Sequence, residues 1–426
     1  MENRLETSQH LTIPFFRILA VSAILVMGML FFFPVFYSVN EAAAIAVPLL
    51  VLVCGIALNK KLKLDKWTAE IYVFLSFWLI YALFGLLWVK DTNLAYYYIR
   101  RILFYLLVFI VSSQFFKHQK YRESAPLFLQ LVFLGYCLIY MWEMATGMHL
   151  PSSRLYGVPL PIPTGAFYNE NNSAVFMLLL APFLTVKTRL TTSRLGKTVA
   201  LVLFLFMLVV SLVQSSRLAL AMIFLLGIYY FIRAGLYIKI ASLILITLSL
   251  AVFIIGFPKE ANFAGLILHR QLTSLEYESK SYLMTSSKIR HRLNIESINL
   301  AAESRFFGTG AGSYETYLNK GRYHRTSWVL NPHNWWMELL ANFGLLITLG
   351  MIFIYLRWLF RLWQLRQASE VKHFDLYDAY FVSLIMFIPL SIIPSSIKSY
   401  YSIWLYFGLI HSVCLAGKLK SDILEV

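Results

Sequence analysis

Long runs of apolar residues alternate with short polar connections along nearly the whole chain. A helix needs about 20 apolar residues to cross the hydrocarbon core of a bilayer. Twelve runs come near this length, and together they predict an all-α polytopic membrane protein that forms a single integral domain over residues 1–426. The runs cover residues 14–36, 41–58, 68–89, 95–114, 126–146, 172–186, 197–213, 218–233, 236–257, 335–357, 377–394 and 399–416.

The composition excludes a water-soluble protein. Of the 426 residues, 59% are hydrophobic and only 14% are charged, whereas about a quarter of the residues of a soluble domain carry charge. A net charge of +16 would suggest nucleic acid as the partner of a soluble protein. Here the basic residues lie between the apolar runs, where anionic lipid head groups account for them. We therefore expect a lipid bilayer, and no nucleic acid, around this chain.

Lysine and arginine in the short connections predict the orientation, because cytoplasmic loops carry most of the positive charge. With the N-terminus in the cytoplasm, the cytoplasmic segments hold 21 Lys and Arg residues and the opposite short connections hold four. Both termini are therefore expected inside, and a 77-residue loop, 258–334, is expected outside between the ninth and tenth spans. This loop carries ten Lys and Arg residues. Long loops translocate regardless of charge, so its basic character suggests an anionic ligand or, alternatively, anionic lipids of the outer leaflet.

Inside the loop, residues 281–303 have the pattern of an amphipathic helix. Its apolar stripe consists of Ile289, Leu293 and Leu300, widened by Ile295, Ile298 and Ala302, and its polar face includes Arg292, Glu296 and Asn299. Gly308, Gly310 and Gly312 follow. Their spacing resembles a phosphate-binding turn, but no strand precedes them and no Lys-Ser/Thr pair follows, so a nucleotide site is not expected. The glycines instead predict a tight turn that returns the chain toward the membrane.

Polar groups at membrane depth are costly and usually functional. Pro332 predicts that the tenth span begins just after it, which places His333 and Asn334 at the outer N-terminus of that helix and Glu338 one turn further on. A neutral imidazole at this position is a candidate general base, because the helix dipole disfavours its protonated form. The alternative is a helix cap with an interfacial histidine and two interfacial tryptophans.

Arginines provide further candidates. Arg217 lies on a very short outer turn and is either a ligand for a lipid phosphate or an anchor that reaches the membrane surface. Arg290 and Arg292 belong to a basic cluster on the loop helix, whose alternative is a solvated face. Arg100 and Arg101 point about 100° apart on a helix, so at least one should face the protein interior.

Two other segments have a predicted role at the membrane interface. The tyrosines that precede Arg100, at positions 96–98, predict an aromatic belt. Asn172 lies at the entry to the sixth span, where an amide can bind sugar hydroxyls. Capping of that helix by Asn171 or Asn172 is the simpler expectation. The sequence contains no Asp-x-Asp pair and no Cys spacing typical of a metal site, so we expect neither a metal nor a cofactor.

These features occur in a defined order: a long outer loop with an arginine-bearing helix, a Gly-x-Gly-x-Gly turn, and then His-Asn at the start of a span with Glu and Gly after it. The chain resembles the O-antigen ligase/polymerase superfamily, which includes O-antigen ligases, O-antigen and capsule polymerases and teichuronic-acid polymerases. The likeness covers the predicted topology and, locally, residues 290–350. It departs at Arg305-Phe306-Phe307, where the family commonly has an acidic residue and proline.

The resemblance implies residue roles. His333 matches the histidine that activates the acceptor hydroxyl, and Arg292 and Arg217 match arginines that bind the diphosphate of the donor. Because the loop alignment is weakened, Arg290 is an alternative to Arg292. Asn334 and Glu338 match positions near the site. The implied reaction is a metal-independent, inverting glycosyl transfer from a polyprenyl-diphosphate-linked glycan, carried out on the outer side of a bacterial cytoplasmic membrane.

The acceptor decides between two related activities. A second lipid-linked repeat would make the protein a polysaccharide polymerase, which we favour, whereas lipid A core or another surface molecule would make it a ligase. Other membrane proteins of polysaccharide assembly are possible partners. A transporter or flippase fits twelve spans as well, but transporters tend to show paired halves with broken helices near mid-membrane, whereas here the polar residues gather on one side.

Overall fold

The computed structural model describes residues 65–214, 216–236, 239–240, 243–244, 247, 286–319, 330–369, 371–393, 396 and 402–417. Every regular element in these ranges is helical. The predicted spans 14–36 and 41–58, nearly all of 236–257, both chain termini and residues 258–285 of the predicted loop lie outside the described residues.

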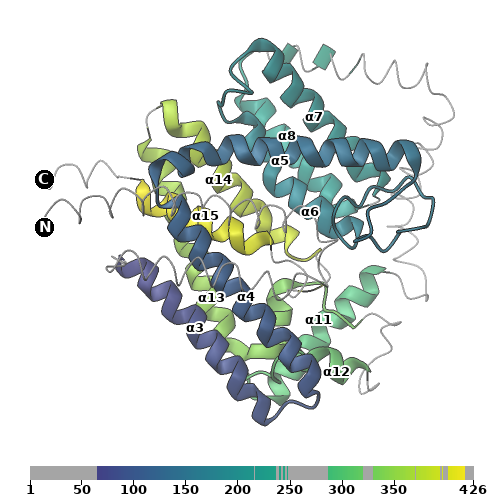
Figure 1. The fold of residues 1–426 in the computed structure, drawn as a ribbon, viewed down its shortest axis with the longest axis vertical. Coiled ribbons are helices and arrows are strands. Elements are labelled where there is room, and N and C mark those ends of the chain that lie inside the picture. The colour runs from purple at the N-terminus through teal and green to yellow at the C-terminus, as the bar shows by residue number, and fades with distance from the viewer. Residues whose placement is uncertain are drawn as a thin grey trace, which may run out of the picture.

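Helices match each predicted span that the structure describes (Figure 1). They are α3 (Lys66–Phe84) with the 3₁₀ helix η2 (Gly85–Leu87), α4 (Thr92–Phe116), α5 (Gln119–Thr146), α6 (Glu170–Leu180) with the 3₁₀ helix η3 (Ala181–Thr185), α7 (Arg194–Val213), α8 (Arg217–Arg233), α11 (Ser286–Glu303), α12 (Ser313–Asn319), α13 (Trp335–Ala368), α14 (Val371–Leu390) and α15 (Ser402–Ala416). Among the described residues, five helical segments are long and apolar enough to cross a membrane: Lys66–Leu87, Thr92–Phe116, Gln119–Thr146, Arg194–Val213 and Trp335–Ala368. The prediction of an all-helical polytopic membrane protein is confirmed, while the count of twelve spans stays a prediction.

Helix ends differ from the predicted spans in a consistent way. α13 continues to Ala368 although its apolar run ends at residue 357, and α5 begins at Gln119 although its run begins at residue 126. The added start of α5 is mainly polar, and the added end of α13 mixes charged residues such as Arg361 with buried apolar residues such as Trp358 and Leu362. Helix propensity does not require an uninterrupted apolar run. The sixth run is divided instead, since Pro182, which has no N–H, lies at the start of η3.

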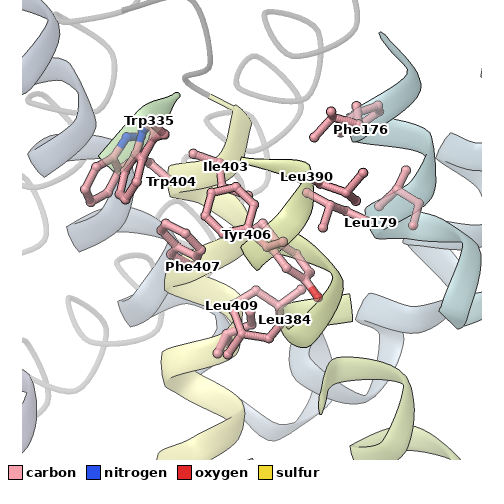
Figure 2. Packing of buried hydrophobic residues seen from close by; sticks show 14 of the residues in the cluster. Phe176, Leu179, Trp335, Leu384, Leu390, Ile403, Trp404, Tyr406, Phe407 and Leu409 are labelled. Atoms are coloured by element: carbon pink, nitrogen blue, oxygen red, sulfur yellow. The ribbon is translucent and has the colours of Figure 1, made fainter. Parts of the chain in front are cut away.

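Aromatic side chains fill the centre of the bundle (Figure 2). Trp404 of α15 stacks on Tyr105 of α4, with ring centroids 5.4 Å apart, and lies 6.3 Å from Trp335 at the start of α13. Phe407 contacts the same cluster, at 5.7 Å from Trp404. Each such aromatic pair adds about 0.5–1.5 kcal/mol beyond the burial of its area. The first turn of α13 is therefore held in a rigid core.

The two ends of the bundle are set by contacts between distant segments. At one end Lys117, at the end of α4, lies 3.7 Å from Asp65, at the start of α3. The end of α4 therefore lies beside the start of α3, and the two helices run antiparallel. At the other end, Tyr98 near the start of α4 donates to Glu338 of α13 at 2.8 Å. We call this second end the Glu338 end. α11 and α12 are packed against α13 there (Figure 1).

α11 confirms the predicted helix over residues 286–303, while residues 281–285 of that prediction lie outside the described residues. Its inward face was predicted only in part. Leu293 and Leu300 are fully buried as expected. Ile295, Ile298 and Ala302 are exposed, and Glu296 is fully buried, so the widened stripe and the polar placement of Glu296 were wrong. The reason is that the buried face of α11 includes hydrogen-bonded polar groups: Ser297 Oγ donates to the Leu293 carbonyl at 2.9 Å.

Candidate functional site

The turn before α13 places His333. Its φ of 50° is in the left-handed region, a conformation that costs a residue other than glycine about 1–2 kcal/mol. Such conformations cluster where the surrounding structure enforces them, often at functional sites. The enforcing contacts come from the end of α14, where the Ser391 carbonyl accepts from Trp335 N–H at 3.0 Å and Ser391 Oγ accepts from Trp336 Nε1 at 3.0 Å.

The imidazole of His333 is half-buried and neutral. Burial lowers its pKa to about 4, with a further decrease caused by the positive charge of Arg290, while a hydrogen bond to the backbone of Ile393 acts in the opposite direction. Nδ1 is buried and has no hydrogen-bond partner among the residues that the structure describes. At neutral pH the ring therefore carries a lone pair that can accept a proton.

Two arginines from separate parts of the chain influence each other electrostatically, and one of them also acts on this histidine. Arg290 lies on the first turns of α11 and Arg217 is the first residue of α8. Burial lowers the pKa of Arg290, and the neighbouring charge of Arg217 lowers it further. The charge of Arg290 also acts on His333, so Arg290 is within electrostatic reach of both other residues. Arg292, which lies two residues after Arg290 on α11, is half-buried. Two neighbouring guanidinium groups favour a ligand with several negative charges, such as a diphosphate.

Carboxylates lie just beneath the histidine turn. Glu338, in the first turn of α13, is 1% exposed and accepts from Tyr98 at 2.8 Å and from Ser396 Oγ at 2.6 Å. The Tyr98 hydroxyl also lies 3.1 Å from Glu315 of α12. Tyr98 thus joins α4, α12 and α13 at one point, and it is buried. The predicted interfacial belt was wrong for this tyrosine, while Tyr96 is 54% exposed.

Two other predicted site residues, Asn334 and Asn172, lie at the starts of helices. Asn334 is the N-cap of α13, and its Oδ1 accepts from the N–H groups of Trp336 and Met337 at 3.1 and 3.3 Å. Asn172 is buried in the first turn of α6, but the cap is Asn169, whose Oδ1 accepts from Asn172 N–H at 2.8 Å. Capping by Asn171 or Asn172 was therefore wrong, and a role in substrate binding for Asn334 and Asn172 stays a prediction.

Arg100 and Arg101 divide as the helix geometry predicts. Arg101 is buried and donates through Nη2 to the hydroxyl of Tyr97 at 2.7 Å, whereas Arg100 is exposed. Arg101 is one turn from Tyr98, so it points into the bundle near the Glu338 end. Whether either arginine binds substrate stays a prediction.

The turn that contains the three loop glycines is hydrogen-bonded to α13, and we call this contact the joint. All three have positive φ, and so does Gly344, where α13 breaks. The break removes the helical N–H partners of the carbonyls of Ala341 and Asn342. These carbonyls instead accept from the N–H groups of Thr309 and Gly310, each at 2.9 Å, and Leu345 N–H donates to the Phe306 carbonyl at 2.8 Å. These backbone hydrogen bonds fix the glycine turn against α13, at the Glu338 end of the bundle.

Comparisons with known proteins agree with this arrangement. Residues 199–355 match the family model of the O-antigen ligase. The resemblance to the O-antigen ligase/polymerase superfamily is thereby confirmed. The chain is also similar to the teichuronic acid biosynthesis protein TuaE of Bacillus subtilis (strain 168), with 27% identity over 364 residues, which is 82% of this chain and 72% of TuaE. Both findings indicate a membrane protein of cell-surface glycan assembly. The matched region includes Arg217, Arg290 and His333.

Two neighbours of the site were not recognised in the sequence. Glu315 follows the glycine turn and Gln214 precedes Arg217, and neither residue belongs to a spacing that indicates chemistry. The only sequence signal was that each is a polar residue next to a candidate segment. Among the described residues, no group of three or more His, Cys, Asp or Glu residues gathers as it would around a metal ion, and the expected independence from metal stays a prediction.

Proposed function

We propose that the protein is a membrane glycosyltransferase that polymerises a cell-surface polysaccharide from polyprenyl-diphosphate-linked glycan repeats, on the outer face of a bacterial cytoplasmic membrane. The observation that carries this proposal is the electrostatic coupling of Arg290 to both Arg217 and a neutral His333 at one end of the helical bundle. The lysine and arginine distribution supports an outer position for this end.

In the proposed reaction, Nδ1 of His333 takes the proton from a hydroxyl of the acceptor sugar. The hydroxyl oxygen forms a bond with the anomeric carbon of the donor, and the bond from that carbon to the diphosphate oxygen breaks. The diphosphate leaves with the electron pair, and Arg217 and Arg290 stabilise the charge that develops on it. A single displacement of this kind inverts the anomeric carbon. The leaving group is already good, so arginines can take the place that a metal ion has in other transferases.

The similarity to the O-antigen ligase family and to TuaE supports a glycan substrate but does not identify the acceptor. One family name refers to ligation of O-antigen, and the name of TuaE refers to biosynthesis of teichuronic acid. A ligase that uses lipid A core or another surface molecule is therefore the second candidate. Transport is a weaker candidate, because the groups gathered here are a base and two cations at one end of the bundle.

Purified protein incubated with a polyprenyl-diphosphate oligosaccharide, with and without a separate acceptor, tests the proposal. A ladder of products from the donor alone identifies a polymerase, and one discrete conjugate that appears only with the acceptor identifies a ligase. Absence of any new glycosidic bond, together with movement of the lipid-linked glycan across proteoliposome membranes, would instead establish a flippase.

Arg217→Ala is expected to weaken use of the donor, because one of two guanidinium groups beside the diphosphate is removed. Loss of one charge-assisted contact predicts a decrease in kcat/KM of roughly 10- to 100-fold. Arg217→Lys should restore only part of it, since an ammonium group lacks the planar fork that binds two phosphate oxygens. Initial rates over a range of donor concentrations measure this effect, and full activity of the alanine variant would remove Arg217 from the site.

The pH dependence of kcat/KM tests the environment of His333. A general base must be neutral to accept a proton. The His333 pKa of about 4 therefore predicts that activity persists well below pH 6.5 and falls only as the pH approaches about 4. Arg290→Gln removes the nearby positive charge, so the pKa of His333 should rise and the acid limb of the profile should move to higher pH. Arg290→Lys keeps the charge and should leave the midpoint in place. A wild-type acid limb at pH 6.5 would argue against a buried His333 as the base.

A further inference from the structure

Gln214 is a buried glutamine whose amide is fixed in one orientation. It caps α7, lies three residues before Arg217 and is 5% exposed. Its Nε2 donates to the Pro163 carbonyl at 2.8 Å. Since a carbonyl oxygen can only accept, the NH₂ group must face Pro163 and Oε1 must face away from it. Oε1 is buried and has no hydrogen-bond partner among the described residues.

A second buried polar group without a partner among the described residues, the hydroxyl of Ser211, lies on the same face of α7. Ser211 is one turn before Gln214 and 1% exposed, and its Oγ is also buried without a partner in the described part of the chain. Residues three apart in a helix are neighbours on its surface. Buried polar atoms are normally hydrogen-bonded, so the two neighbouring unpaired atoms, Ser211 Oγ and Gln214 Oε1, require an explanation.

Gln130, on α5, shows that this state is not general for buried glutamines of the bundle. Its Nε2 donates to the carbonyls of Phe183 and Val186 at 2.8 and 3.0 Å, and its Oε1 accepts from Thr188. Every polar atom of that amide has a partner. The free acceptor of Gln214 is therefore a local property of the turn that carries Arg217.

We infer that Oε1 of Gln214 binds the first sugar of the donor, accepting a hydrogen bond from a hydroxyl or an amide N–H next to the diphosphate, with Ser211 as its neighbour. This inference rests on the proposed function, because it places the sugar beside the phosphates that Arg217 binds. Gln214 then determines specificity for the glycan, whereas Arg217 binds any lipid diphosphate. The bond to Pro163 presets the amide, so the site is ordered before the sugar arrives.

Binding to two probes tests the assignment. One probe is a short polyprenyl diphosphate, and the other is the same lipid carrying one N-acetylhexosamine on the diphosphate. Dissociation constants are measured with the full-length protein in nanodiscs. Wild type should bind the sugar-bearing probe more tightly, by about tenfold for one good hydrogen bond. Gln214→Met, which keeps the length of the side chain but has no carbonyl, should bind both probes equally and bind the bare lipid as wild type does.

Gln130→Met is the matched control, because it removes a buried glutamine remote from Arg217, and it should retain the preference for the sugar. Gln214→Glu adds a second test: it keeps an acceptor oxygen but loses the N–H donor to Pro163 and adds a negative charge, so it should bind both probes more weakly while retaining part of the preference for the sugar. A Gln214→Met protein that still prefers the sugar-bearing probe, or a wild type with no preference, overturns the inference. Failure of wild type to bind either probe would instead contradict the proposed function.

Discussion

His333→Ala is expected to abolish glycan extension while the protein accumulates and inserts normally. His333 is the neutral base of the proposed reaction, and a positioned general base typically contributes about 100- to 10,000-fold to the rate. The measurement is the initial rate of product formation by purified variants at saturating donor. Polymer of normal length and rate from the alanine variant would exclude His333 as the base.

His333→Asn separates chemistry from backbone conformation in this experiment. Asparagine tolerates the left-handed region in which His333 lies, so the turn before α13 should be retained while the base is lost. We expect the same decrease in rate as in the alanine variant, with donor affinity close to that of wild type. His373→Ala is the matched control, because His373 is an exposed histidine of α14 and should have wild-type activity. Restored activity in the asparagine variant would mean that the turn, and not the imidazole, is what matters.

The sequence predicts the helices well because the membrane imposes a strong and local signal. A run of about 20 apolar residues can satisfy its backbone in lipid only as a helix or in a closed barrel, so α3, α4, α5, α7 and α13 are evident from the sequence alone. The end of α13 and the start of α5 are less evident, because a helix can extend beyond the apolar run into sequence that contains charged and polar residues. The hydropathy pattern reports the apolar run, and the helix obeys propensity and capping as well.

The candidate site was predictable where its residues lie next to a structural boundary. His333 follows Pro332 and begins a span, and Arg217 begins another, so both are conspicuous in the sequence. Tyr98 was not predictable, because its partner Glu338 is 240 positions away and nothing in the local pattern indicates the pairing. The inward face of α11 was mispredicted for a related reason: Glu296 is buried by tertiary contacts that hydrophobicity does not reveal.

The joint between the glycine turn and α13 explains why two distant segments need glycine. A Cβ on Gly344 would lie 2.3 Å from the Phe306 carbonyl oxygen, and a Cβ on Gly308 would lie 2.5 Å from the nitrogen of Gly344. Both contacts are with backbone, which cannot rotate away as a flexible side chain can. Both glycines also have positive φ, at 76° and 87°. With ψ at −174°, Gly344 lies in a region that is essentially restricted to glycine, so alanine there adds conformational strain of about 1–3 kcal/mol.

Gly344→Ala is therefore expected to open this joint and to lower both stability and activity. The three backbone hydrogen bonds between the turn and the break would be displaced together, and the loop helix that carries Arg290 would lose its fixed position relative to His333. We expect a melting temperature several degrees lower in detergent, faster proteolysis within residues 286–319, and loss of most transferase activity. Gly308→Ala should act in the same direction, which provides a second variant if the first does not accumulate.

Gly135→Ala is the control for these variants, since Gly135 lies within α5 and a Cβ there would meet nothing within 4 Å. Alanine in a helix interior is more favourable than glycine by about 0.5–1 kcal/mol, so this variant should be as stable as wild type or slightly more stable. Equal melting temperatures and activities for Gly344→Ala and Gly135→Ala would contradict the joint. A Gly344→Ala protein that is stable but inactive would separate its two roles: α13 would fold without the turn, and the turn would serve to bring the arginine of α11 to the histidine.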